Sequence, residues 1–346
     1  MTRVLLVGEI MRNNVGWSFA TLLPAMGHQV VVVNDRNFFV CDTLTLSTRL
    51  LSRLSTPLQK LRYAVALRRV ALQTQPDLVL ILKGARIRRS TLQAIRRSTG
   101  APIVNYILDD YFPLNSRAIP ESMRECIPAY DLIATSKRYN VPELLAAGAR
   151  RAIYVRSAHD PRAHHPVQPT AQDRQRFGAD VLFVGTYERD RAAMLESLAE
   201  QAEARIAVYG NGWQAIPSSS PLYPFVHRRP LYGPDKLLAF ASCKIALCFL
   251  RKANRDTYTD RSFEIPATGA FMLAERSSEH ALLFDEGEEM ACFGSADELV
   301  QKVRYYLAHD HERAHIAAAG HRRLLAGHHT YQDRLSEILA AARSLP

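Results

Sequence analysis

The sequence predicts an α/β fold made of two α/β domains, the first of them doubly wound. Residues 3–8 and 29–33 are apolar enough for buried strands, and a glycine-bearing loop at 9–16 and a helix at about 17–26 separate them. Strand, loop, helix and strand in this order open a doubly wound α/β domain. A similar order begins again at residue 180, after a proline-rich stretch at 157–178. With 346 residues, the chain is long enough for two domains of ordinary size.

Further strands and helices alternate through the first domain. We expect strands at 77–82, 102–108, 131–136 and 152–156, and a helix at 141–147. A long basic region at 44–73 is expected to be helical and to break near Pro57. Its apolar stripe favours a core helix with a solvated face, with an interfacial helix resting on lipid as the alternative. The stripe consists of Leu50, Leu51, Leu54, Leu58, Leu61, Val65 and Leu72.

The second domain repeats the alternation with different loops. We expect strands at 180–184, 205–209 and 245–250, helices ending near 203 and 242, and closing helices at 297–308, 311–326 and 332–343. Residues 258–275 form the stretch around which we interpret the chain. A short helix there carries Arg261 and Glu264, Pro266 and Gly269 end it, and a strand follows at 270–273.

The stretch between the two domains is polar and broken by prolines, which is typical of a linker. Its histidines, His159, His164 and His165, could form a metal site, but their irregular setting favours an interdomain hinge. The five cysteines are odd in number and widely spread, so we expect them to be reduced.

Charge is divided unevenly between the two halves. The net charge is +10, and residues 1–165 carry 23 basic and 11 acidic residues (+12), against 21 and 23 (−2) in residues 166–346. We expect the basic half to meet an anionic partner: a phosphorylated or acidic acceptor, a membrane surface or nucleic acid. A solvated basic face without a ligand is the alternative. No apolar run reaches the length of a membrane span and no cleavable leader is evident, so we expect a cytoplasmic protein. Peripheral contact with the inner face of the membrane stays open.

Charged residues lie where strands of the first domain end. Lys83 follows the strand at 77–82, and Asp109 and Asp110 follow the strand at 102–108. Ligands of open α/β sheets bind beyond the carboxyl ends of the strands. The two aspartates could hold an acceptor hydroxyl or act as a base, or they could cap the next segment.

In the second domain, Glu264 could accept hydrogen bonds from the vicinal hydroxyls of a ribose, and Arg261 could face a phosphate. The glycine turn at Gly185, with Arg189 and Arg191 nearby, suits a diphosphate. A surface Arg–Glu pair on a helix is the plain alternative. The dinucleotide fingerprint G-x-G-x-x-G is absent, so NAD binding has weak support.

Several motifs resemble those of the CgeB-type (spore-maturation-like) glycosyltransferases, which are similar to the wider group with the GT-B fold. The similar segments are Val181–Tyr187, Arg261–Glu264, Gly269–Leu273, Gly320–Arg322, His329–Tyr331 and Arg334–Leu335. The likeness is good over 180–335 and looser in the first domain. It implies two facing Rossmann-like domains: residues 1–165 on the acceptor side, residues 166–329 holding a nucleotide-sugar donor, and a C-terminal helix at 330–346 that crosses back to the first domain.

The resemblance also implies an activity and a set of site residues. It implies a metal-independent glycosyltransferase that moves a sugar from a nucleotide-diphosphate sugar, its co-substrate, to an acceptor hydroxyl on a glycan, lipid-linked molecule or protein, with no cofactor. Glu264 matches the carboxylate that binds the donor ribose, and Asp256 lies eight positions earlier, where related enzymes have an acid near the donor sugar. The expected donor residues are Gly185, Arg189, Arg191, Gly210, Arg251, Asp256, Arg261 and Glu264. The expected catalytic residues are Asp109 and Asp110, with Glu9, Asn13 and Lys83 on the acceptor side.

Two other classes of function stay open. A sugar-nucleotide epimerase would also use two domains and would convert the donor without an acceptor. A non-catalytic binding or assembly protein could keep the fold and would tolerate changes at Glu264. Nucleic acid is not expected as a partner.

Overall fold

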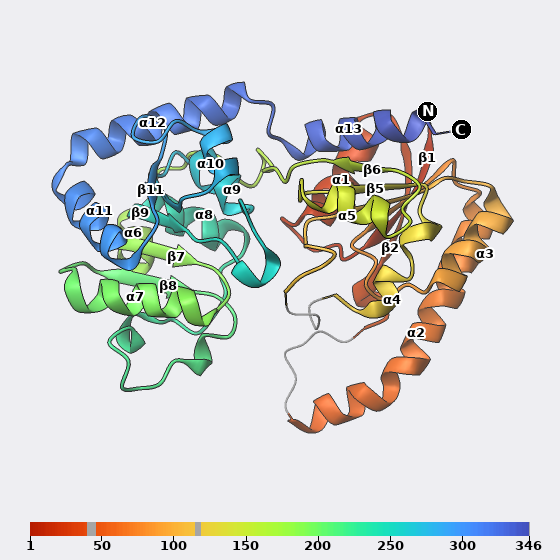
Figure 1. Cartoon of the computed structure of the whole chain (residues 1–346), viewed down its shortest axis with the longest axis horizontal. Helices are drawn as coiled ribbons and strands as arrows, with labels where there is room; N and C mark the ends of the chain where they lie inside the picture. The colour runs from red at the N-terminus through yellow and green to blue at the C-terminus, as the bar shows by residue number, and fades with distance from the viewer. Residues whose placement is uncertain (40–45, 115–118, 346) are drawn as a thin grey trace. The chain divides into compact units, whose positions relative to one another are not determined.

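Contacts within the chain define two compact units in the computed structural model (Figure 1). The structure describes residues 1–39, 46–114 and 119–345, without the side chains of 46–56. Unit 1 comprises residues 1–156, 253–255 and 331–346, and unit 2 comprises residues 157–252 and 256–330. Residues 157–165, which the sequence analysis grouped with the first domain, therefore belong to unit 2.

Unit 1 is built on a parallel sheet with the strand order β2-β1-β3-β4-β5-β6. β1 pairs with both β2 and β3, so that Val7 lies between Val33 and Ile81. Every residue of β3 and β4 is buried, as expected for parallel strands covered on both faces. The strands are β1 (Arg3–Gly8), β2 (Gln29–Asn34), β3 (Leu78–Leu82), β4 (Ile103–Ile107), β5 (Leu132–Thr135) and β6 (Ala152–Tyr154).

The helices of unit 1 are α1 (Val15–Ala25), α2 (Leu46–Thr74), α3 (Arg89–Thr99), α4 (Glu121–Arg124), α5 (Asn140–Ala146) and α13 (Tyr331–Arg343). α3 lies in a stretch, residues 84–101, for which the sequence pattern predicts no element. α3 buries Thr91, Leu92 and Ile95 on one side and ends at Gly100, whose φ of +68° favours glycine.

The expected break near Pro57 is wrong, because α2 continues through this proline. Proline removes one backbone hydrogen bond, but Pro57 is exposed, so water can hydrate the carbonyl group that is left. Farther along, Tyr63, Leu67 and Ala71 anchor the helix in the core of unit 1. The side chains of Leu50, Leu51 and Leu54 lie outside the described residues.

Unit 2 has a second parallel sheet, with the order β11-β10-β9-β7-β8. The strands are β7 (Ala179–Val184), β8 (Ile206–Tyr209), β9 (Cys243–Cys248), β10 (Met272–Glu275) and β11 (Ala291–Phe293). The helices are α6 (Ala171–Phe177), α7 (Arg189–Gln201), α8 (Gly233–Ser242), α9 (Arg261–Ala267), α10 (Ser278–Leu283), α11 (Ala296–Ala308) and α12 (Asp310–Ala326). These elements confirm the α/β fold with two parallel sheets.

Two local expectations for unit 2 need correction. The stretch expected to be linker up to 178 contains α6, which Thr170 starts with a reciprocal capping box to Asp173. α9 continues past Pro266 to Ala267, so the proline is the next-to-last residue of the helix and removes one backbone hydrogen bond without ending it.

The C-terminal helix confirms the expected return to the first domain. α13 belongs to unit 1, and the Tyr331 ring meets Phe19 of α1 edge to face, with 6.2 Å between ring centroids. Among the described residues, Cys126, Cys243, Cys248 and Cys292 are free thiols, while Cys41 lies outside the description. No helix in the described ranges combines the length and apolar character that a membrane span requires.

Candidate functional site

α9 places Arg261 and Glu264 on adjacent turns in unit 2. The backbone N–H of Arg261 donates to the Thr259 hydroxyl, which fixes the start of the helix. All residues from Ser262 to Ala267 are buried, so packing rather than helix propensity holds this short element. Gly269, with φ +76°, then turns the chain toward β10.

The Glu264 carboxylate contacts three basic side chains, although Glu264 is only 6% exposed. Its Oε1 accepts a hydrogen bond from Lys236 Nζ at 2.8 Å, and its Oε2 accepts one from Arg261 Nη1 at 2.7 Å. His164 Nε2 lies 3.4 Å from Oε1. Burial alone would raise the pKa of the Glu264 carboxyl, but the charges of Arg261 and Lys236 outweigh it and hold that pKa well below its usual range.

Two members of this cluster, Lys236 and His164, are not among the donor residues that the sequence predicts. Lys236 lies on α8 and is buried, and burial lowers the pKa of its ammonium against the attraction of Glu264. His164 comes from the proline-rich stretch before α6, and burial lowers the pKa of its imidazole to about 4. His164 is therefore neutral at pH 7. Neither residue stands in a recognisable motif, so only the fold reveals the cluster.

The position of the cluster in the sheet agrees with a ligand site. Arg261 Nε donates to the carbonyl of Val184, the last residue of β7, at 3.0 Å. The guanidinium therefore lies at the carboxyl end of the strand, where α/β sheets bind ligands. An ionised carboxylate has about four acceptor positions. Three basic groups already contact Glu264, so a ribose would have to share or replace some of these contacts.

Gly185 and Gly210 lie together where β7 and β8 end. Gly210 has φ +152°, and a Cβ there would meet the Gly185 carbonyl oxygen at 1.8 Å. Trp213 Nε1 donates to the same oxygen at 2.8 Å. The need for glycine at 210 thus arises from contact within the protein, while approach of a donor to these residues stays a prediction.

The other arginines expected on the donor side differ in how far their side chains are already bonded within the protein. Arg191 is buried and donates to the carbonyls of Thr186, Phe249 and Leu250, so we do not assign it to a diphosphate. Arg251 Nε donates to Glu188 at 2.8 Å, and the Arg251 backbone N–H donates to Asp256 at 3.3 Å. Arg189 is exposed at the start of α7.

In unit 1, the residues that we expected on the acceptor side lie at the carboxyl edge of the sheet. Lys83 follows β3 with φ +60°, and its Nζ lies 2.7 Å from Asp109, which follows β4. Glu9 follows β1 and pairs with Arg36 at 3.3 Å, and Asn13 has φ +65° in the loop before α1. The structure therefore brings Lys83 and Asp109 together, while Glu9 makes a separate ion pair.

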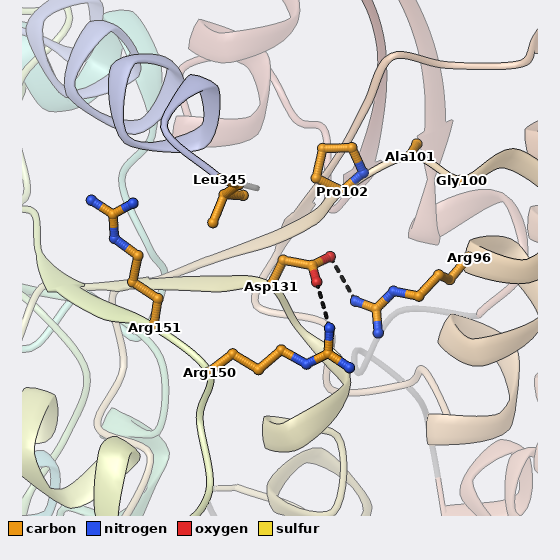
Figure 2. Close-up of a pocket in the computed structure, with 8 residues that line it drawn as sticks. All are labelled: Arg96, Gly100, Ala101, Pro102, Asp131, Arg150, Arg151 and Leu345. Carbon is orange, nitrogen blue, oxygen red and sulfur yellow. Dashed lines mark hydrogen bonds and ion pairs between the residues drawn. The ribbon is translucent and has the colours of Figure 1, made fainter.

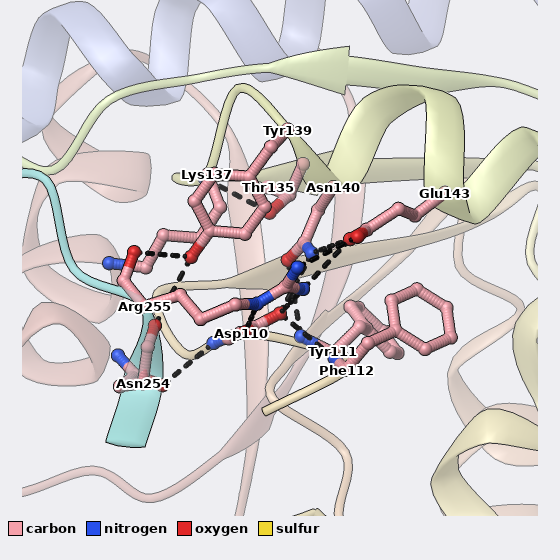
Figure 3. Close-up of polar contacts among 10 residues, drawn as sticks. All are labelled: Asp110, Tyr111, Phe112, Thr135, Lys137, Tyr139, Asn140, Glu143, Asn254 and Arg255. Atoms are coloured by element: carbon pink, nitrogen blue, oxygen red, sulfur yellow. Dashed lines mark hydrogen bonds and ion pairs between the residues drawn. The ribbon is translucent and has the colours of Figure 1, made fainter. Parts of the chain in front are cut away.

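Asp110 is buried and its side chain lies in a polar network (Figure 3). Its carboxylate accepts hydrogen bonds from Arg255 at 2.5 and 2.8 Å, from Asn140 at 2.8 Å and from the Phe112 backbone at 2.9 Å. Arg255 also donates to Glu143 at 2.8 and 2.9 Å. Burial would raise the pKa of the Asp110 carboxyl, but these hydrogen bonds hold it below the ordinary value. We therefore interpret Asp110 as a structural residue rather than a base.

A pocket in unit 1 lies at the opposite edge of the sheet (Figure 2). Asp131, just before β5, pairs there with Arg96 at 2.6 Å and Arg150 at 3.0 Å, and Arg151 and Leu345 complete the wall. This is the amino-terminal edge, away from Lys83 and Asp109. Arg96 and Arg150 are thus paired with the Asp131 carboxylate, and Arg151 donates to Ser344 Oγ at 2.8 Å, so we assign no ligand to this pocket.

The histidines near the unit boundary do not gather into a metal site. His159 Nδ1 lies 2.9 Å from the His329 carbonyl, His165 Nδ1 lies 3.1 Å from the Pro161 carbonyl, and His164 faces Glu264. Within the residues that the structure describes, no group of three or more His, Cys, Asp and Glu side chains has the geometry of a metal site.

Comparison with known proteins gives a family match over part of the sequence. Residues 189–340 match a family model described as glycosyl transferase-like. This segment contains Arg261, Glu264, Lys236 and Arg251. No curated protein matches the sequence.

Solved structures share the fold of the whole chain. Alr3699/HepE of Anabaena in complex with UDP and glucose is 12% identical, with 100% of each chain covered and a TM-score of 0.66. Sucrose-phosphate synthase of Thermosynechococcus elongatus is 12% identical, with 100% of this chain and 99% of the other covered and a TM-score of 0.69. A putative UDP-N-acetylglucosamine 2-epimerase of Listeria monocytogenes is 13% identical, with 99% and 96% covered and a TM-score of 0.59. The fold is thus the one seen in GT-B glycosyltransferases.

Proposed function

We propose that the protein is a glycosyltransferase that moves a sugar from a nucleotide-diphosphate sugar to an acceptor hydroxyl. The observation that carries this proposal is the match of residues 189–340 to the glycosyl transferase-like family, because that segment contains Glu264 with its partners Lys236 and Arg261. The likeness to a structure in complex with UDP and glucose supports uridine diphosphate as the first nucleotide to test.

The donor side of this proposal lies in unit 2. Glu264 would bind the ribose, exchanging part of its present contacts with Lys236 and His164 for the sugar hydroxyls. Arg261, Arg251 and Arg189 would neutralise the diphosphate, whose departure is the chemical problem of the reaction. Asp256, bound to the Arg251 backbone, would lie near the donor sugar, and Gly185 and Gly210 near the diphosphate.

The acceptor side would lie in unit 1. Asp109 is one-third exposed and paired with Lys83, so it could hold or deprotonate a hydroxyl at the carboxyl edge of the sheet. Glu9 and Asn13, in the neighbouring loop after β1, would contact the rest of the acceptor. The acceptor class that fits the basic unit is an anionic or lipid-linked molecule, a glycan or a protein.

Two finer points belong to the same proposal. The motif likeness supports a CgeB-type enzyme within the glycosyltransferases. The sequence lacks Asp-x-Asp and has arginines on the donor side, which supports transfer without a divalent metal or other cofactor.

Turnover of UDP-glucose by the full-length chain tests this function. We expect release of UDP that rises at least tenfold when a suitable acceptor from a panel of glycans, lipid-linked sugars and peptides is added. The Glu264→Ala variant should lose most of this release. Absence of UDP release with every sugar nucleotide and acceptor, together with no nucleotide binding, would contradict the proposal.

A sugar-nucleotide epimerase is the second candidate, because a putative UDP-N-acetylglucosamine 2-epimerase shares the fold. The same reactions distinguish the two activities. An epimerase would convert one sugar nucleotide into another without an acceptor. It would not show a release of UDP that depends on the acceptor. Chromatography of the sugar nucleotides after incubation would reveal that product.

A further inference from the structure

The long helix α2 has two apolar faces on opposite sides. The inner face carries Tyr63, Leu67 and Ala71, which are buried in the core of unit 1. Tyr63 packs against Phe39 with 5.3 Å between ring centroids and donates a hydrogen bond to Asp35. This face is enough to hold the helix on the sheet, since a surface helix normally needs one apolar stripe.

The outer face carries a second stripe of large aliphatic side chains that are open to solvent. Leu58, Leu61, Val65 and Leu72 are 60%, 61%, 54% and 57% exposed. Their spacing of three, four and seven residues places them on one side of the helix, along about 21 Å of its length. Contiguous exposed apolar surface of this kind marks an interaction site in soluble proteins.

The charge of α2 indicates what this stripe meets. Residues 46–74 contain six basic residues and no acidic residue, and residues 46–99 contain twelve basic residues and one acidic residue, Asp77. Arg62, Arg68 and Arg69 are exposed and lie beside the aliphatic stripe. A row of leucines flanked by arginines, with the axis in the plane of the surface, is the pattern of a helix that lies in a membrane interface.

We propose that the outer face of α2 binds the surface of an anionic lipid bilayer. Leu58, Leu61, Val65 and Leu72 enter the region between headgroups and acyl chains, and Arg62, Arg68 and Arg69 contact the lipid phosphates. In Figure 1, α2 (orange) lies at the outer side of unit 1, with its amino-terminal half extending away from the sheet. The proposed membrane-facing surface therefore belongs to unit 1.

Nucleic acid is the rival partner of a basic surface, and the aliphatic stripe argues against it. Phosphates and base edges attract arginine and lysine, but the four aliphatic side chains of the stripe cannot form hydrogen bonds or ion pairs with them. Lipid uses both kinds of side chain. The leucines and the arginines should consequently contribute to binding together.

Co-sedimentation of the full-length protein with vesicles tests this proposal. We expect at least tenfold tighter binding to vesicles with 30% phosphatidylserine in phosphatidylcholine than to phosphatidylcholine alone at 0.1 M NaCl, weakening at 0.5 M NaCl. Leu58→Gln with Leu61→Gln should weaken binding about tenfold or more, since two aliphatic side chains are lost from the interface. Arg62→Glu with Arg69→Glu should have a similar effect, and lysines at both positions should restore binding.

The matched control is Leu145→Gln with Leu282→Gln, which changes two exposed leucines outside α2 and should bind as the wild type does. A Leu61→Trp variant gives a second measure, because its fluorescence should shift to shorter wavelength on vesicles while that of Leu145→Trp stays unchanged. Equal weak binding to both lipids would overturn the proposal. So would anionic binding that is unaffected by the leucine changes, or binding to a 30-nucleotide RNA without binding to vesicles.

Discussion

The environment of single side chains decides the chemistry of unit 2. Glu264, Lys236 and His164 share one buried site, and the pKa values of all three are lowered, but the causes and the resulting charges differ. The charges of Arg261 and Lys236 keep the Glu264 carboxyl ionised, whereas burial keeps His164 neutral. A buried carboxylate held by two cations can receive a polar ligand without changing its own protonation state.

The depressed pKa of His164 predicts a loss of stability in mild acid. In the unfolded chain His164 takes up a proton near pH 6.5, while the folded protein resists it until about pH 4. The unfolded state binds more protons in this window, so the free energy of unfolding falls as pH drops from 6.5 to 4, by at most about 3 kcal/mol. Denaturant titrations of wild type and His164→Gln between pH 7 and 5 should show that the free energy of unfolding depends less steeply on pH in the variant. Parallel slopes would contradict the assignment.

Asp109 should affect turnover rather than nucleotide affinity. It pairs with Lys83 at 2.7 Å at the carboxyl edge of unit 1 and is one-third exposed. If it activates or positions the acceptor hydroxyl, Asp109→Asn should lower the transfer rate by about 10² or more while nucleotide affinity stays within a few-fold. Asp77→Asn, an exposed carboxylate at the other edge of the same sheet, is the matched control. Transfer at the wild-type rate by Asp109→Asn would remove the residue from the acceptor side.

At the scale of elements, the segment after β4 is held by the Asp110 network. Asp110 is fully buried and depends on Arg255 for its charge balance. Arg255→Ala should lower the free energy of unfolding by about 3–5 kcal/mol, because it leaves a buried carboxylate uncompensated. Arg276→Ala removes an arginine that also pairs with two carboxylates, Glu286 and Glu298, but in an exposed setting, and should cost about 1 kcal/mol.

Equal losses of stability for Arg255→Ala and Arg276→Ala would contradict a structural role for the Asp110 network. Adding Asp110→Asn to Arg255→Ala should recover part of the loss, since the uncompensated charge is then gone. Urea titrations monitored by circular dichroism measure all three variants.

The alternation of apolar strands and helices predicted the elements better than the contacts between them. Strands such as β1, β3 and β7 follow from short apolar runs, and the start of α9 follows from its spacing. Asp110 and Arg255, by contrast, are 145 positions apart, and Lys236 and Glu264 are 28 apart. Local pattern carries no information on such pairs, so Asp110 was expected to be catalytic and Lys236 was overlooked.

The buried face of α2 could not be predicted from the sequence pattern. Its leucines at helical spacing favoured a core helix, but the core uses Tyr63, Leu67 and Ala71 instead. Both faces of the helix are apolar, and only the fold determines which of them the sheet covers.

For the whole molecule, the absence of Asp-x-Asp and the supply of arginines predict nucleotide binding that does not need a divalent metal. Calorimetry with the tightest nucleoside diphosphate should give affinities within a few-fold in EDTA and in magnesium. Arg251→Ala should weaken binding under both conditions, because it removes one of the proposed phosphate contacts. A loss of nucleotide affinity of tenfold or more in EDTA would show that binding requires a divalent metal.

Binding of UDP and 2′-deoxy-UDP to wild type and Glu264→Ala tests directly whether the Glu264 cluster holds the donor ribose. Calorimetry on all four combinations, with Glu298→Ala as a matched carboxylate change elsewhere in unit 2, separates contact with the hydroxyl from a general effect on the site. Loss of charge-assisted hydrogen bonds should cost roughly 1.5–3 kcal/mol, or about 10- to 150-fold in UDP affinity. Wild type should prefer UDP, Glu264→Ala should lose that preference, and Glu298→Ala should keep it. If Glu264→Ala binds UDP as tightly as wild type, or weakens both nucleotides equally, Glu264 does not hold the ribose and the likeness to glycosyltransferases is one of fold alone.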